Sequence, residues 1–234
     1  MRFDKEKHSL LLSNLVKEIY KKPSLAATLG FKGGTAAMLF YDLPRGSVDL
    51  DFDLLDESKK DKVFKEIKDL ADKFGKNLEA VEKRRTLFFL ISYEKGAKKI
   101  KIEISKRLGK SEFEVRSFLG ISVKVMEKNS MLSNKLCALI SRRYLAARNL
   151  FDTWFFLKNG WEFCPEVVKG NLGVELSEAL KKAILFVEKV TRNQILYGLG
   201  EFIDDKDKNW LKDNLKDELL FQLKLAAKNV RKEV

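Results

Sequence analysis

The apolar positions in the first half of the chain switch between two spacings, which predicts helices interleaved with strands. Residues 5–22 carry apolar side chains at helical spacing until Pro23 ends the run, and a second amphipathic segment covers 57–75. Short runs rich in β-branched and aromatic residues predict strands around these helices. These strands lie at 27–32, 47–54, 86–93, 99–105, 113–118 and 121–126, with a short apolar helix at 34–42. We therefore expect a mixed sheet in this half.

From about residue 129 onward the pattern is helical almost throughout. Apolar residues recur at helical spacing near 130–144, 149–158, 175–190 and 215–231. No repeat or long linker separates the two halves. Strands followed by a run of helices indicate the α+β class. The sequence thus predicts two domains, a mixed-sheet domain with an N-terminal helix at 1–127 and a helical C-terminal domain at 128–234.

Polar residues concentrate in two neighbouring motifs within this pattern. A glycine pair with a threonine lies at the predicted turn from strand 27–32 into helix 34–42: Gly33, Gly34 and Thr35. Glycine lets backbone N–H groups approach a phosphate there, and the helix directs its positive end at the same point. Three carboxylates alternate along the next strand and so share a face: Asp49, Asp51 and Asp53. Such carboxylates repel one another unless a cation lies among them, which indicates magnesium-dependent nucleotidyl transfer.

Each motif taken alone has an ordinary explanation. A glycine pair marks any tight turn, and alternating aspartates also occur on solvated edge strands and in calcium loops. A helix-loop-helix calcium site does not fit, because Leu54 stands where the turn glycine is needed and Lys60 where the last glutamate ligand is needed. The two motifs joined at this spacing favour a phosphate and metal site.

The two motifs resemble the signature of the DNA polymerase β-type nucleotidyltransferase superfamily, which is Gly-Gly-Ser/Thr, a spacer and then Asp-x-Asp. The block 33–52 is similar, more narrowly, to the opening motif of the AbiEii family, the toxin halves of abortive-infection toxin–antitoxin pairs. Two later blocks, 135–139 and 148–152, resemble that family's Lys-x-x-Ala-Leu and Arg-Asp-x-x-Asp elements. The matches extend from about residue 25 to about residue 160. The resemblance implies a polymerase β-type nucleotidyltransferase domain followed by a helical domain.

The resemblance also implies roles for individual residues of the first domain. Asp49 and Asp51 would be catalytic and bind Mg²⁺, with Glu103 as a third metal ligand from a later strand. The alternative for Glu103 is a solvent-facing glutamate paired with a lysine across the sheet. Asp53 would have a structural or indirect role. The residues that would bind the NTP are Gly33, Gly34, Thr35, Arg45 and Ser47. Arg45 and Ser47 could equally stabilise the turn.

In the second domain the resemblance assigns Lys135 to the triphosphate, with an exposed lysine as the alternative. It assigns Asp152 to the catalytic machinery, where this residue would orient Lys135 or anchor the helical domain. Seventeen residues separate them, about 25 Å on one straight helix, so they can serve one site only if the chain bends between them. Residues 142–144 are where we expect the break. Asn149 stands where the family usually has aspartate, so an acid–base or metal role there is not supported.

The charge of the chain narrows the choice of partner. Lys and Arg number 46 against 34 Asp and Glu, a net charge of +12, which is commonest in proteins that meet nucleic acid or an acidic membrane surface. Residues 81–110 hold ten basic side chains against three acidic ones. They predict a track for an RNA backbone, with a solvated hairpin as the alternative. The track would comprise Lys83, Arg84, Arg85, Lys98, Lys99, Lys106, Arg107 and Lys110.

No run of about 18 uncharged apolar residues occurs, and the start of the chain lacks the apolar stretch of a signal peptide. We therefore expect a cytoplasmic protein with no membrane partner.

These observations predict a Mg²⁺-dependent enzyme that transfers NMP from an NTP to RNA. The resemblance further implies the 3′ end of tRNA as acceptor, and a role as the toxin of a phage-defence pair that an antitoxin regulates. One alternative is nucleotidylation of a small molecule such as an aminoglycoside, although such sites tend to be acidic. Another is a non-catalytic, basic RNA-binding protein on an inactive transferase scaffold.

Overall fold

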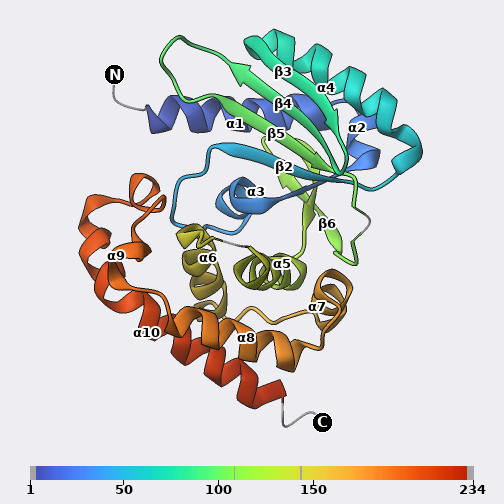
Figure 1. Cartoon of the computed structure of the whole chain (residues 1–234). Coiled ribbons are helices and arrows are strands. Elements are labelled where there is room, and N and C mark those ends of the chain that lie inside the picture. Colours follow the sequence, from blue (N-terminus) through green and yellow to red (C-terminus); the bar gives the residue numbers. More distant parts are fainter. Residues whose placement is uncertain (1–3, 108, 143, 231–234) are drawn as a thin grey trace. The chain divides into compact units, whose positions relative to one another are not determined.

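The computed structural model describes residues 4–107, 109–142 and 144–230, which divide into two compact units (Figure 1). The first unit comprises the chain up to residue 107 together with Phe113–Met126. The second comprises Gly109–Glu112 together with the chain from Glu127 onward. Each unit has its own apolar interior. The α+β class predicted from the sequence is confirmed, since a mixed sheet is followed by helices.

The first unit is built on a seven-stranded sheet with the order β3-β4-β5-β2-β1-β7-β6. Strand β2 lies at its centre, antiparallel to β1 and parallel to β5. The central strands bury large side chains such as Phe31 and Phe52, whose ring centroids are 5.1 Å apart. The strands are β1 Leu29–Lys32, β2 Asp49–Leu54, β3 Lys76–Lys83, β4 Thr86–Ser92, β5 Ile100–Ser105, β6 Phe113–Phe118 and β7 Ile121–Met126.

Helices cover the apolar face of this sheet. Helices α1 Lys5–Tyr20, α2 Pro23–Thr28 and α4 Lys60–Phe74 pack against one another (Figure 1). Their apolar stripes are fully buried, as at Leu15 and Ile67, and each such side chain contributes about 1.5–3 kcal/mol relative to an exposed one. The remaining helices of the unit are α3 Gly33–Phe40, which follows β1 directly, and the 3₁₀ turn η1 Glu57–Lys59.

Strand β3 is the main element that the apolar pattern did not predict. It lies at the edge of the sheet and pairs only with β4 among the described strands. Half or more of its residues are exposed, and it is rich in lysine and glutamate. An edge strand with no buried face needs no apolar alternation, so the period-2 signal is absent.

The second unit is helical in its described residues. Leu211, Leu215, Leu219 and Leu223 recur every four residues along the last helix and bury the face that packs against α6 and α8. Short helices α7 and α9 were not predicted, and the last helix begins earlier than the predicted residue 215, because its first turns are mostly polar. The helices are α5 Lys128–Ser141, α6 Ala147–Lys158, α7 Pro165–Leu172, α8 Leu176–Glu188, α9 Arg192–Ile195, η2 Gly200–Phe202 and α10 Asp205–Val230.

In the part of the chain that the structure describes, no helix combines the length and the apolar character needed to span a membrane.

Candidate active site

The acidic strand presents its carboxylates as the alternation predicts. Along β2 the even-numbered residues Leu50, Phe52 and Leu54 are buried, whereas the three aspartates between them are partly exposed. Asp49, Asp51 and Asp53 therefore share one face of the sheet, opposite the face that contributes to the core.

Strand β5 adds a second row of charged side chains to this face. Its parallel pairing with β2 places Glu103 opposite Asp51 and Lys101 opposite Asp49. Lys101 Nζ lies 3.1 Å from Asp49 Oδ2 and 3.7 Å from Glu103 Oε1, so one ammonium contacts both carboxylates. The side chain of Glu103 is 41% exposed and has its lysine partner on its own strand, not across the sheet.

Sequence reasoning did not include Lys101 among the site residues, although a signal for it was present. Lys101 precedes Glu103 by two residues, so any strand that turns Glu103 toward the aspartates turns Lys101 the same way. Burial acts to lower the pKa of Lys101, but the charges of Asp49, Glu103 and Asp51 outweigh it, so the pKa lies above its ordinary value.

A second lysine balances the other end of the acidic strand. Lys32 Nζ lies 2.5 Å from Asp53 Oδ1, and both side chains are mostly buried. The antiparallel pairing of β1 with β2 sets Lys32 opposite Asp51 and Gly30 opposite Asp53. Asp53 is therefore the diagonal neighbour of Lys32, within reach of a long side chain. Asp53 is thus engaged in an ion pair, which agrees with the structural role expected for it.

The start of the acidic strand is also held by a buried histidine from α1. His8 is 1% exposed, and its Nε2 lies 3.1 Å from the carbonyl oxygen of Val48, to which it donates. Its Nδ1 then accepts from the Tyr93 hydroxyl at 3.1 Å. Burial lowers the pKa of His8, so the ring stays neutral at pH 7 and keeps both hydrogen bonds.

The glycine turn lies directly against the second aspartate. Gly33 has φ +83°, a left-handed conformation that favours glycine. A Cβ atom at this position would be 2.4 Å from Asp51 Oδ2, closer than non-bonded atoms can approach. The absence of a side chain at residue 33 is therefore what lets the Asp51 carboxylate lie beside the turn.

We expect Gly33→Ala to destabilise the protein more than a matched glycine replacement does. Gly120 has φ +79°, but a Cβ added there would meet no atom within 4 Å, so Gly120→Ala carries only the backbone strain, about 1–3 kcal/mol. Gly33→Ala carries the same strain and the clash with Asp51 in addition. Denaturant unfolding of the two variants measures the difference. Equal losses of stability would show that Asp51 moves aside freely.

The second glycine is enclosed by the turn that leads into β2. A Cβ at Gly34 would be 2.8 Å from Arg45 Nη2 and 3.0 Å from Ser47 Oγ. Arg45 is 5% exposed and donates from Nη1 to the carbonyl oxygen of Gly46 at 2.8 Å. Thr35 is fully buried; its hydroxyl donates to the carbonyl oxygen of Asp49 and shares a 2.9 Å hydrogen bond with Ser47. These contacts fix the glycine turn to the first residue of the acidic strand.

The acidic face fits a Mg²⁺ site of the kind that a substrate completes. No three His, Cys, Asp or Glu side chains within the described ranges gather closely enough to enclose a metal ion. Mg²⁺ in phosphate-transferring enzymes is, however, usually held by one or two carboxylates together with substrate phosphates and water. The Lys101 ammonium shows that a positive charge is accommodated beside Asp49. Asp49 and Asp51 therefore suit such a cation, whereas a cage made wholly of protein ligands is not formed.

In the second unit, Lys135 and Asp152 form a buried ion pair. Helix α5 ends at Ser141 and α6 begins at Ala147, so the chain turns between them, although Arg143 lies outside the described residues. Lys135 Nζ lies 2.7 Å from Asp152 Oδ2, and Asp152 is fully buried.

Asn149 lies one turn before Asp152 on the same helix and is 6% exposed. An aspartate there would add a second buried carboxylate close to Asp152, which the neutral amide avoids. The Asn149 Nδ2 atom has no hydrogen-bond partner among the described residues.

The predicted RNA track does not form one continuous cluster. One group lies where the β3–β4 turn meets the end of β5, since Lys106 N donates to Arg85 O at 2.9 Å. We name it the hairpin-end cluster, and it consists of Lys83, Arg84, Arg85, Lys106 and Arg107. Two further residues precede β5, at the end of the strand nearer Lys101: Lys98 and Lys99. Lys110 belongs to the second unit.

The side chains of two lysines in the hairpin-end cluster contact other residues of the chain. Lys106 is 2.6 Å from Glu82, and Lys83 lies 3.5 Å from the centroid of the Phe88 ring. The hairpin-end cluster lies at the C-terminal end of β5, whereas Lys98 and Lys99 precede its N-terminal end. The length of the strand therefore separates the two groups.

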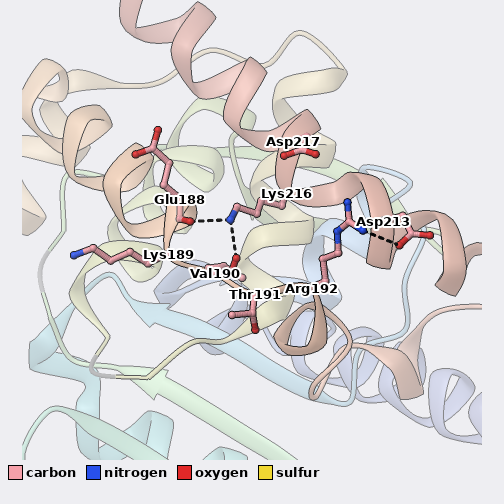
Figure 2. A pocket seen from close by; sticks show the side chains of 8 residues that line it. All are labelled: Glu188, Lys189, Val190, Thr191, Arg192, Asp213, Lys216 and Asp217. Atoms are coloured by element: carbon pink, nitrogen blue, oxygen red, sulfur yellow. Dashed lines mark hydrogen bonds and ion pairs between the residues drawn. The ribbon is translucent and has the colours of Figure 1, made fainter.

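A pocket of about 390 Å³ in the second unit contains none of the predicted site residues (Figure 2). The charged residues that line the pocket are balanced in number. Three are acidic, Glu188, Asp213 and Asp217, and three are basic, Lys189, Arg192 and Lys216. Lys216 Nζ donates to the carbonyl oxygens of Glu188 and Val190 at 2.7 and 2.8 Å. This lysine therefore stabilises the C-terminal end of α8 instead of offering its charge to a ligand.

Comparison with solved structures places the fold among nucleotidyltransferases. A candidate nucleotidyltransferase from Helicobacter pylori is 20% identical with a TM-score of 0.64, over 100% of this chain and 99% of that one. JHP933 from Helicobacter pylori is also 20% identical, with a TM-score of 0.63, over 99% and 96% of the two chains. An antigenic nucleotidyltransferase-like protein from Paracoccidioides brasiliensis is 14% identical with a TM-score of 0.50, over 86% and 96%. No curated protein sequence matches the chain.

A glycine turn against an acidic strand, on this fold, defines the class of the protein as a nucleotidyltransferase. The family model described as the nucleotidyl transferase AbiEii toxin of type IV toxin–antitoxin systems matches residues 15–218. The chain therefore belongs to the AbiEii family, and the resemblance read from its motifs is confirmed. Membership implies a nucleotidyltransferase toxin that uses an NTP and has an antitoxin partner.

Proposed function

We propose that this enzyme transfers NMP from an NTP to an RNA acceptor, the 3′ end of tRNA, in a Mg²⁺-dependent reaction. The observation that carries the proposal is the contact between the glycine turn and the acidic strand, where only a hydrogen atom at Gly33 leaves room for Asp51. Phosphate-binding backbone and metal-binding carboxylates thus adjoin each other. The family further suggests that the reaction acts in phage defence under the control of an antitoxin.

The residues of the first unit take separate parts in this reaction. Asp49 and Asp51 hold Mg²⁺, and Glu103 supplies a further oxygen beside Asp51. When bound, Mg²⁺ neutralises the triphosphate and lowers the pKa of the attacking hydroxyl. Backbone N–H groups of Gly33 and Gly34 bind phosphate, because no side chain caps the start of α3 and these donors have no helical partner.

The remaining proposed residues position or neutralise the nucleotide. Arg45 and Ser47 lie beside Gly34 and contact phosphate or ribose, while Thr35 holds the backbone of Asp49 in place. Lys135 contributes positive charge for the triphosphate, and Asp152 keeps its ammonium oriented. The parts of Lys135 and Asp152 follow from the family resemblance.

An RNA acceptor is supported by charge. The net charge of +12 favours a polyanion over a polycationic small molecule such as an aminoglycoside. The hairpin-end cluster offers three exposed arginines, Arg84, Arg85 and Arg107, that can contact phosphates.

Replacing these three arginines with glutamine should weaken RNA binding and reduce its dependence on salt. The slope of log affinity against log salt concentration should fall by about 2, because each lost phosphate contact removes about 0.7 for a single strand. Filter binding or fluorescence anisotropy across a salt series measures this slope. A control that removes three exposed lysines of α4, Lys65, Lys68 and Lys73, matches the change in charge. An equal effect of both triple variants would exclude a specific track.

The reaction itself is tested by incubating the purified protein with each of the four labelled NTPs and total RNA. Label transferred to RNA, and to tRNA after size separation, supports the proposal. Label that appears only on an added aminoglycoside would favour a small-molecule acceptor. RNA binding without any transfer of label would favour a non-catalytic RNA-binding protein.

A further inference from the structure

The acidic face carries its own internal cations, one at each end of β2. Lys32 pairs with Asp53 at 2.5 Å, and Lys101 contacts Asp49 and Glu103 at 3.1 and 3.7 Å. The two lysines differ in the carboxylates that they contact. Lys32 neutralises an aspartate outside the proposed metal set, whereas Lys101 lies between two carboxylates that belong to it. The Lys101 ammonium thus lies beside two carboxylates that a divalent cation would contact.

We infer that Lys101 is a positioning residue that holds Asp49 and Glu103 in the absence of metal and couples the entry of the metal to the entry of the nucleotide. This inference rests on the proposed function. It assigns a role to a residue that neither the acidic motif nor the glycine motif contains.

The need for such a residue follows from electrostatics. Asp49, Asp51 and Glu103 lie on adjacent strands with Asp51 directly opposite Glu103, so without a cation their charges repel one another. An ammonium between Asp49 and Glu103 offsets this repulsion and keeps both side chains in place. The pairing is reversible because the side chain of Lys101 is 33% exposed and its flexible stem lets the charged end move toward solvent.

The same contact disfavours metal binding when the nucleotide is absent. A divalent cation that binds Asp49 would bring a second positive charge close to the Lys101 ammonium and so weaken the Lys101–Asp49 ion pair. A bound triphosphate supplies a new anionic partner for this ammonium, so nucleotide binding removes part of this cost. Coupling between two ligands is reciprocal, so the nucleotide must raise the affinity for metal to the extent that metal raises the affinity for the nucleotide.

Binding of Mn²⁺, followed by electron paramagnetic resonance with and without a non-hydrolysable NTP analogue, tests this role. Lys101→Met should bind Mn²⁺ about tenfold more tightly than the wild type when nucleotide is absent, and the enhancement by nucleotide should shrink by about the same factor. Lys101→Arg keeps the charge and should retain the wild-type coupling. Lys68→Met removes the same charge from an exposed position of α4 and should leave Mn²⁺ binding unchanged.

Two outcomes separate the inference from the proposed function. If folded Lys101→Met bound Mn²⁺ with wild-type or weaker affinity, the role of Lys101 would be overturned. The metal site would still be supported in that case, provided that Asp49→Asn abolished Mn²⁺ binding. Mn²⁺ binding that survives Asp49→Asn would overturn the metal assignment itself. Lys101→Gln repeats the measurement should Lys101→Met fail to fold, as judged by circular dichroism.

Discussion

Asp49→Asn and Asp51→Asn are each expected to lower nucleotide incorporation at least about a thousandfold, since a metal site that stabilises transferred phosphate contributes several kcal/mol to the transition state. The amide keeps the size of the side chain but removes the negative charge that binds Mg²⁺. Both residues lie on the partly exposed face of β2 and contribute nothing to the apolar core. The variants should therefore stay folded. Incorporation of labelled NMP into RNA, with circular dichroism as the check on folding, measures the effect.

Asp53→Asn is the matched control for these two variants. Asp53 lies on the same strand and the same face, but its carboxylate is paired with Lys32 and lies outside the proposed metal set. We expect its loss of activity to stay below about tenfold, the lower range for residues that act through a neighbour of the metal site. If Asp49→Asn and Asp53→Asn lowered activity equally, the two aspartates could not be assigned different roles. Unchanged incorporation by Asp49→Asn with Asp51→Asn would refute the metal site.

Lys135→Ala is expected to reduce both the stability of the protein and its activity. Asp152 is fully buried, and removing one partner of a buried ion pair costs about 3 kcal/mol or more because the remaining charge stays in a poorly solvating environment. The side chain of Lys135 is itself only 15% exposed, so the pair is largely shielded from water. Denaturant unfolding should show the loss of stability, and the NTP concentration required for incorporation should rise.

A double variant separates the two effects. Lys135→Met combined with Asp152→Leu replaces both charges by apolar side chains of similar length, and such replacements of buried pairs are often neutral or stabilising. We expect stability to return toward the wild-type value while activity stays low, because the positive charge for the triphosphate is still absent. Activity that returned together with stability would reduce Lys135 to a structural residue.

Local patterns predicted much of the first unit because its central strands are buried on one face. Period-2 alternation in residues 49–54 is enough to set three aspartates on the side opposite the core. The tight turn at Gly33 was also predicted, because a glycine pair stands between a predicted strand and a predicted helix. Strand β3 could not be predicted in the same way, because an exposed, charged edge strand shows no alternation of apolar and polar residues.

The partners of these residues depend on contacts between segments that are distant in the chain. That β5 runs parallel to β2, with Glu103 opposite Asp51 and Lys101 opposite Asp49, is a matter of strand order and register. A shift of one residue would turn Glu103 and Lys101 into the core. The pairing of Lys135 with Asp152 likewise depends on how α5 and α6 pack after the turn between them.

Amino-acid order alone was thus sufficient to identify the carboxylates, the glycine turn and the family, because each of these is a feature of neighbouring residues whose side chains repeat at the period of one element. Only folding assigned Lys101 to Asp49 and Lys32 to Asp53, and only folding selected contact with Lys135 among the parts expected for Asp152. These ion pairs join residues that come together when apolar faces are buried. The local spacing of apolar residues does not determine which elements pack against each other.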